Sequence, residues 1–427
     1  MHRNDTLEYA QQLDHNDALL GYRDRFFIPK DKEGHDVIYM CGNSLGLMPK
    51  SSKSYINEVL SDWQNLAVEG HFFAKDPWIS YHDHLAGPMS KIVGSKPGEI
   101  VIMNTLTVNI HLLMVSFYKP DQKRNKILFD FNPFPSDRYA IESQIKFHGI
   151  DPTDAMIELK PETGEYIVSQ DKIENTIAEY GDQIALILIG GINYYSGQLY
   201  DIKSITKAGH KHGCIVGFDL AHAAGNVVLN LHDDGPDFAA WCTYKYLNSG
   251  PGNLSGVFIH ERHHHNDTLP RFTGWYGNDM KTRFLMEPKF QPVPTAEGWQ
   301  VSNQPVIGFA SIRASLDIFA EVGMPILRKK SEMLTAYLEF LISIIPGSHL
   351  RVITPKEAQN RGSQLSLQMV KPDKALFRYL MDHGVVLDWR EPDVLRVAPA
   401  PLYNTFEDVW HFHRILKDGL EHIFSNT

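Results

Sequence analysis

Two polar residues stand where apolar segments end, and their types suit covalent chemistry. Lys245 follows the apolar run 239–243 and precedes the turn-forming sequence 248–252, while Asp219 closes the apolar run 215–218. In an open α/β sheet, ligands bind at the ends of strands, so both residues are candidates for a site. Each also has an ordinary alternative, because a carboxylate there can cap the next helix and a lysine can extend to solvent.

Taken as a pair, the lysine and the carboxylate are what pyridoxal phosphate requires. A desolvated amine is the neutral nucleophile that forms a Schiff base with the cofactor's aldehyde, and a carboxylate keeps the pyridine nitrogen protonated so that the ring accepts electrons. We therefore predict a soluble enzyme that holds pyridoxal phosphate on Lys245, with Asp219 at the ring nitrogen. His222, three residues after Asp219, could approach the ring, although a structural histidine is an equally good interpretation.

Two further segments could hold the phosphate and the ring. Residues 104–109 offer hydroxyls before the apolar run 110–118, and free N–H groups at a helix start bind phosphate. The sequence 134–137, Phe-Pro-Ser-Asp, offers an aromatic face, a hydroxyl and a carboxylate in one turn. Tyr244 could donate another hydrogen bond to the phosphate. A plain helix cap and a plain proline turn are the alternative interpretations.

Apolar runs alternate with helical stretches after residue 99, which is typical of a mainly parallel sheet between helices. The expected strands are residues 126–131, 185–189, 215–218, 239–243 and 254–259. The expected helices are residues 51–66, 84–93, 202–212 (capped by Gly213), 306–345 and 406–423, with a further strand at 364–370. We divide the chain into an N-terminal segment, 1–50, a large cofactor-binding domain, 51–305, and a small α+β domain, 306–427.

Composition excludes several classes of function. The 427 residues carry a net charge of −10, which gives no general attraction for nucleic acid or anionic membrane. No apolar run of about 18 residues occurs, so we expect no signal peptide and no spanning helix, and a cytoplasmic location follows. The three cysteines predict reduced thiols. We expect no metal site: the histidines at 263–265 and those at 411 and 413 are interpreted as solvent-facing.

The chain resembles the kynureninase family, a part of the aminotransferase class V group of fold type I pyridoxal-phosphate enzymes. The resemblance runs through most of the chain. Its matching stretches are residues 41–47, 70–71, 75–78, 103–109, 134–137, 193–198, 218–222, 243–248, 274–275, 301–305 and 395–404. It implies a seven-stranded, mainly parallel sheet between helices in the large domain and a smaller C-terminal α+β domain.

The resemblance also assigns roles to individual residues. Those implied to hold the cofactor are Leu106, Thr107, Phe134, Ser136, Asp137, Asp219, His222, Tyr244, Lys245, Trp275 and Asn303. Those implied to contact the substrate are Asn43, Ser44, His71, Ser302, Asn303 and Arg396, with Arg396 clamping the α-carboxylate. A homodimer is implied as well, in which Trp275, Ser302 and Asn303 reach the site of the neighbouring subunit.

The reaction implied is hydrolytic cleavage of the Cβ–Cγ bond of L-kynurenine or 3-hydroxy-L-kynurenine, in tryptophan catabolism and in pyridine nucleotide biosynthesis. Lys245, Asp219 and Tyr244 would be the catalytic residues. Three alternatives stay open: a class V aminotransferase, a cysteine desulfurase or selenocysteine lyase, and a binding protein that holds the cofactor without turnover. The desulfurase type needs a thiol on a loop well after the lysine, and no cysteine follows Cys242.

Overall fold

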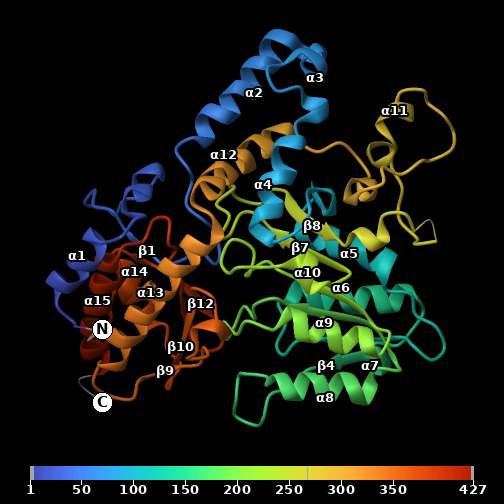
Figure 1. Ribbon diagram of the computed structural model, residues 1–427. Helices are drawn as coiled ribbons and strands as arrows, with labels where there is room; N and C mark the ends of the chain where they lie inside the picture. The colour runs from blue at the N-terminus through green and yellow to red at the C-terminus, as the bar shows by residue number, and fades with distance from the viewer. Residues whose placement is uncertain (1–3, 267, 425–427) are drawn as a thin grey trace.

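The computed structural model describes residues 4–266 and 268–424, and its centre is a seven-stranded sheet (Figure 1). The strand order is β2-β8-β7-β6-β5-β3-β4. The bounds are β2 Ile100–Met103, β3 Lys126–Phe129, β4 Met156–Glu158, β5 Ile184–Gly190, β6 Ile215–Asp219, β7 Phe238–Cys242 and β8 Ser255–Ile259. Strand β8 runs antiparallel to its two neighbours, β2 and β7, and the other pairs within the described part of this sheet are parallel, so the expected seven-stranded, mainly parallel sheet is confirmed.

Both faces of this sheet are buried, which explains why its strands are apolar throughout. Side chains alternate between faces along a strand, so Ile187 and Leu188 belong to different cores. The core of Ile187 also contains residues of α4 Asp83–Val93, α8 Gln170–Tyr180, α9 Ile202–Lys211 and α12 Val306–Val322. The core of Leu188 also contains residues of α5 Leu106–Phe117, α6 Pro135–Phe147 and α7 Pro152–Ala155.

A second, four-stranded antiparallel sheet has the order β12-β13-β10-β9. Its strands are β9 Leu350–Val352, β10 Leu365–Met369, β12 Asp388–Arg390 and β13 Val394–Val397. A short parallel pair, β1 Ile38–Tyr39 with β11 Val385–Val386, brings the start of the chain to the same region. Its core includes residues of α1 Leu7–His15, α13 Met324–Ser343, α14 Ala375–Asp382 and α15 Phe406–Phe424.

The remaining helices are α2 Ser52–Leu66, α3 Gly70–Phe73, α10 Leu231–Asp234 and α11 Met280–Arg283. In Figure 1, α2 and α3 lie at the upper edge of the molecule and α11 at the upper right. Helix α12 packs against α2 and α4. The division of the chain at 50 and 305 stays a prediction. None of the helices within 4–266 and 268–424 has the length and apolar character that crossing a membrane requires.

Three sequence predictions differ from the structure. The helix expected over 306–345 is two helices, because Gly323 adopts φ +80° between α12 and α13, a conformation that favours glycine. His413 is buried on the inner face of α15, whereas His411 is exposed as expected. His264 is also buried, where its Nε2 lies 2.9 Å from the Ile259 carbonyl oxygen, and His263 contacts the buried Asp237.

Candidate active site

A cavity of about 470 Å³ lies where strands of the large sheet end, a size common for small-molecule sites. It is formed by the segments that follow β2, β3, β5, β6 and β7, together with the loop at 43–44 and the strands β12 and β13. Its lining residues are Asn43, Ser44, Thr105, Leu106, Thr107, Asp130, Phe134, Ser136, Asp137, Gly190, Ile192, Tyr194, Asp219, Ala221, His222, Tyr244, Lys245, Gly252, Arg390 and Arg396.

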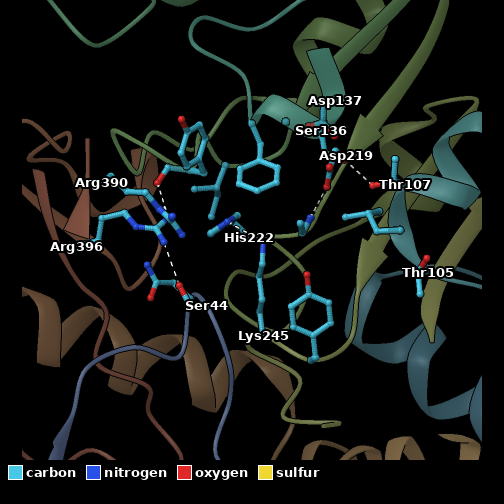
Figure 2. A pocket seen from close by; sticks show the side chains of 18 of the residues that line it. Ser44, Thr105, Thr107, Ser136, Asp137, Asp219, His222, Lys245, Arg390 and Arg396 are labelled. Carbon is cyan, nitrogen blue, oxygen red and sulfur yellow. Dashed lines mark hydrogen bonds between the residues drawn. The ribbon is translucent and has the colours of Figure 1, made fainter. Parts of the chain in front are cut away.

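One end of the cavity can bind an anion through hydroxyl and backbone N–H groups, without a basic side chain among the residues that line that end. Helix α5 starts there, and its N-cap residue Thr105 makes no side-chain capping hydrogen bond. Thr107 Oγ1 and Ser136 Oγ lie 2.7 Å apart across the gap between α5 and α6. Figure 2 shows Thr105 and Thr107 on one side of the cavity and Arg390 and Arg396 on the other. Hydroxyls and free N–H groups at a helix start suit a phosphate.

The centre of the cavity holds the lysine and the histidine that the sequence singled out. Lys245 Nζ lies 3.0 Å from Nε2 of His222 and 5.8 Å from the ring centroid of Phe134. His222 is buried, and burial together with the neighbouring Lys245 lowers the pKa of His222 well below its usual value. The imidazole is therefore neutral at physiological pH and can pack against an aromatic ring without a charge penalty.

Three carboxylates lie behind this centre. Asp219 Oδ1 accepts a hydrogen bond from the Ala221 N–H at 2.7 Å, which fixes its orientation at the end of β6. Burial raises the pKa of Asp219, and burial and the charge of Asp219 raise the pKa of Asp137. Burial likewise raises the pKa of Asp130 to about 7. A positive charge placed beside Asp219 would favour the ionised form of this carboxyl, because solvent does not screen the attraction there.

Arg396 and its partners form the other end of the cavity. The Arg396 guanidinium donates to the Tyr194 carbonyl oxygen at 2.9 Å, to Ser44 Oγ at 3.1 Å and to Asp388 Oδ2 at 2.6 Å. Only 1% of its side chain is exposed, and its Nε has no hydrogen-bond partner among the described residues. Arg390 also pairs with Asp388, at 2.9 Å. Buried donors without a partner are expected where a ligand completes the hydrogen bonding.

The cavity brings together most of the residues that the sequence assigned to the site. These are Asn43, Ser44, Leu106, Thr107, Phe134, Ser136, Asp137, Asp219, His222, Tyr244, Lys245 and Arg396. Four assigned residues do not line it, and all four are exposed: His71, Trp275, Ser302 and Asn303.

The sequence did not single out three polar side chains that line the cavity, Asp130, Tyr194 and Arg390. Asp130 directly follows strand β3. The argument from strand ends that identified Lys245 and Asp219 could therefore have identified Asp130 as well. Tyr194 lies within a stretch already matched to the family. Arg390 carries no signal of its own, because its place in the cavity depends on the pairing of β12 with β13.

The chain was compared with known families and proteins. A family model described as the kynureninase C-terminal domain matches residues 327–416. A kynureninase of Flavobacterium psychrophilum is 54% identical over 418 residues, which cover 97% of this chain and 98% of that protein. A kynureninase of Myxococcus xanthus is 52% identical over 413 residues, which cover 97% of each chain.

Solved structures share the fold at much lower identity. A cysteine desulfurase of Escherichia coli, CsdA, has a TM-score of 0.76 at 15% identity and covers 94% of this chain and 98% of its own. A complex of the cystine C-S lyase C-DES with cysteine persulfide has a TM-score of 0.75 at 16% identity, and the match covers 90% of this chain and 97% of that one. The two kynureninases named above are each more than 50% identical to this chain over nearly its full length. The chain therefore belongs to the kynureninase family.

Proposed function

We propose that this chain is a pyridoxal-phosphate-dependent hydrolase that cleaves the Cβ–Cγ bond of L-kynurenine or 3-hydroxy-L-kynurenine. The products are L-alanine and anthranilate or 3-hydroxyanthranilate. The observation that carries the proposal is one cavity that holds Lys245, Asp219 and Arg396, in a chain 54% identical to a kynureninase over nearly its full length. Lysine, acid and arginine are the three groups that cofactor attachment, ring activation and carboxylate binding need.

The cofactor would occupy the part of the cavity between the start of α5 and Lys245. Thr107, Ser136 and the start of α5 would hold its phosphate, with Leu106 and Tyr244 beside them. His222 and Phe134 would pack on its ring, while Lys245 would hold its aldehyde carbon. The pyridine nitrogen would face Asp219, whose neighbour Asp137 shares its buried environment. The Nδ1 of His222 is buried without a hydrogen-bond partner in the described chain, which is consistent with a missing polar group.

The substrate's carboxylate would lie against Arg396. The unpartnered Nε of that guanidinium would donate to one carboxylate oxygen, and a terminal nitrogen would donate to the other in exchange for one of its present bonds to Tyr194, Ser44 or Asp388. Ser44 and Asn43 come from the loop beside it, and Asn43 Nδ2 donates to Gln364 Oε1 at 2.9 Å, which holds that loop in place. This end of the cavity therefore fixes the amino-acid part of the substrate.

Within the reaction, the bound cofactor would supply an electron sink for the charge that develops on the substrate. Lys245, once free of the cofactor, would remove the α-proton, and Asp219 would stabilise the positive ring nitrogen. Water must then add to the γ-carbonyl carbon. Tyr244 is our candidate to hold and move the proton in that step, because burial raises the pKa of its phenol and keeps the proton on it at neutral pH.

We also propose a homodimer in which Trp275, Ser302 and Asn303 complete the neighbouring site. These residues are exposed, as is His71. Exposed aromatic side chains connect the segment next to His71 with Trp275. Phe72 packs on Phe284 with ring centroids 6.3 Å apart, and Phe284 packs on Trp275 with ring centroids 5.3 Å apart. Other apolar side chains exposed in the same two segments of the chain are Trp63, Val68, Phe73, Leu285 and Met286. Contiguous exposed apolar surface of this kind marks an interface.

The metabolic pathway and the cellular location that we propose follow from the proposed reaction. The enzyme would act in the kynurenine pathway of tryptophan catabolism, and its hydroxylated product would feed pyridine nucleotide biosynthesis. We propose a cytoplasmic location. The small-molecule substrate would be the only partner besides the second subunit, with no nucleic acid and no membrane.

The cysteine desulfurases that share this fold suggest a competing activity, and the cysteines argue against it. Cys41, Cys214 and Cys242 are all buried. Burial raises the pKa of the Cys41 thiol to about 11 and raises those of Cys214 and Cys242 as well. A thiol needs to be ionised and accessible to act as a nucleophile, so none of the three suits sulfur transfer.

One assay tests the proposed function. Purified protein with added cofactor is incubated separately with kynurenine and 3-hydroxykynurenine, and alanine and the fluorescent aromatic product are measured together. The proposal predicts equal amounts of the two products without any keto-acid acceptor. A requirement for a keto acid would indicate an aminotransferase, and cofactor absorbance without product would indicate a binding protein.

A further inference from the structure

A second group of chemically competent side chains lies at the opposite end of the large sheet. Strand β2 begins after Glu99 and reaches the cofactor cavity after Met103, so about 13 Å of strand separates the two places. Glu99 meets two histidines there: His232 from α10 and His260, which follows β8. Three connections that are far apart in the sequence are thereby joined at one point.

The distances among these donors match those of a tetrahedral metal site. His232 Nδ1 lies 3.0 Å from Glu99 Oε1, and His260 Nδ1 lies 3.8 Å from the same oxygen. All three donor atoms lie within 4.8 Å of one another. A zinc ion with ligands at about 2.0–2.1 Å places its donors roughly 3.3 Å apart, so small side-chain movements would close the site.

The carboxylate is held in place from behind. Glu99 is fully buried, and its two oxygens accept the backbone N–H groups of Lys96 and Glu261, each at 3.0 Å. Such fixed hydrogen bonds orient a metal ligand before the ion arrives. Within the part of the chain that the structure describes, the ion pairs of Glu99 are with these two imidazoles, so the buried carboxylate has no lysine or arginine partner in contact.

The histidines are placed as ligands as well. Their rings stack with centroids 5.2 Å apart and an interplanar angle of 25°, and both Nδ1 atoms lie near Glu99 Oε1. His260 Nδ1 also accepts the Arg262 N–H at 3.3 Å, a long hydrogen bond that a metal ion would replace. His232 is 26% exposed and His260 14%, so an ion and a water molecule can enter from solvent.

We propose that Glu99, His232 and His260 form a binding site for a divalent cation of the zinc type. Two imidazole nitrogens with one carboxylate oxygen favour zinc and its first-row neighbours over magnesium and calcium. The fourth ligand is water, because the neighbouring Glu261 carboxylate is paired with Lys96 Nζ at 2.6 Å. Because the site lies away from the cofactor cavity, its role is to fasten the connections around β2, α10 and β8.

Cobalt(II) binding tests the site, because tetrahedral cobalt absorbs in the visible range at longer wavelength than the cofactor. The holoenzyme, prepared without a histidine tag and treated with a chelator, is titrated with Co²⁺ and then with Zn²⁺. The site predicts one cobalt ion per chain, intense tetrahedral bands, and displacement by zinc. Zinc should also raise the thermal unfolding temperature, and the rise should continue as free zinc exceeds its dissociation constant.

Variants assign the signal to these residues. His232→Gln and Glu99→Gln should each weaken cobalt binding by more than the roughly 10–100-fold that loss of a supporting contact causes. His82→Gln is the matched control, since His82 lies in a second cluster with Asp83 and Glu297. The proposal is overturned if cobalt binding is absent, if it survives in His232→Gln, or if it is lost in His82→Gln alone. His232 is partly exposed, so its variant should fold even if Glu99→Gln does not.

Discussion

Replacement of Arg396 by lysine separates the shape of the guanidinium from its charge. In the structure, Arg396 donates three hydrogen bonds to Tyr194, Ser44 and Asp388, and its buried Nε is left for a ligand. A lysine ammonium keeps the charge but offers a single point instead of two parallel N–H groups. The variant should therefore lose one charge-assisted hydrogen bond to the substrate's carboxylate.

Such a bond contributes about 1.5–3 kcal/mol, which corresponds to a rise in KM of roughly 10- to 150-fold. The turnover number should change much less, because the carboxylate is held equally in the ground state and the transition state. Initial rates of kynurenine consumption measure both constants, and cofactor absorbance with thermal unfolding checks that the protein is intact. Arg378→Lys is the matched control, as Arg378 is exposed on α14. A change in KM below about threefold in an intact Arg396→Lys variant would refute the carboxylate role.

Three other substitutions test the account at different levels. Asp219→Asn should keep the cofactor bound but lower turnover by about 10²–10³-fold, the usual loss when one stabilising contact to developing charge is removed; unaltered turnover would exclude the acid's role. Gly46→Ala should reduce cofactor content, because its Cβ would lie 2.3 Å from the carbonyl oxygen of Lys245, whereas Gly21→Ala, with nothing within 4 Å, should not. Asp237→Asn should destabilise the fold by about 3–5 kcal/mol, measured by urea unfolding at pH 7. Burial raises the pKa of Asp237, but hydrogen bonds from His210 and His263 outweigh this effect and hold that pKa well below its usual value. The ionised Asp237 therefore stabilises the fold above the unfolded-state pKa of about 4, and this stabilisation is lost as the pH falls below that value. The difference in free energy of unfolding between the parent and Asp237→Asn should accordingly become smaller only in acid. A smaller difference already at about pH 6 would contradict this explanation.

The sequence predicted the centre of the site because local patterns determine it. Strands β6 and β7 are continuous apolar runs, so the polar residues at or beyond their ends, Asp219 and Lys245, had to emerge at one edge of a parallel sheet. The Arg396 assignment came from family resemblance, and the structure places it in the same cavity. Apolar runs bounded by turn-forming residues were sufficient to predict those strands of the large sheet that were expected from the sequence.

Other features depend on contacts that no local pattern records. The break at Gly323 is hidden because α12 and α13 both bury apolar faces, so the helical period continues across it. Burial of His413 depends on which face of α15 meets the second core. The meeting of Glu99 with His232 and His260 depends on the antiparallel pairing of β2 with β8, which the spacing of those residues does not reveal.

The attachment of the cofactor to Lys245 is the claim on which the proposed function depends. Borohydride reduction of the holoenzyme, followed by peptide mass mapping, locates the lysine that carries the pyridoxyl group. If Lys245 carries the cofactor, the pyridoxyl group will be found on the peptide that contains Lys245, and the Lys245→Ala variant will form no stable adduct. A pyridoxyl group on a different lysine, or an undiminished adduct in Lys245→Ala, would contradict it.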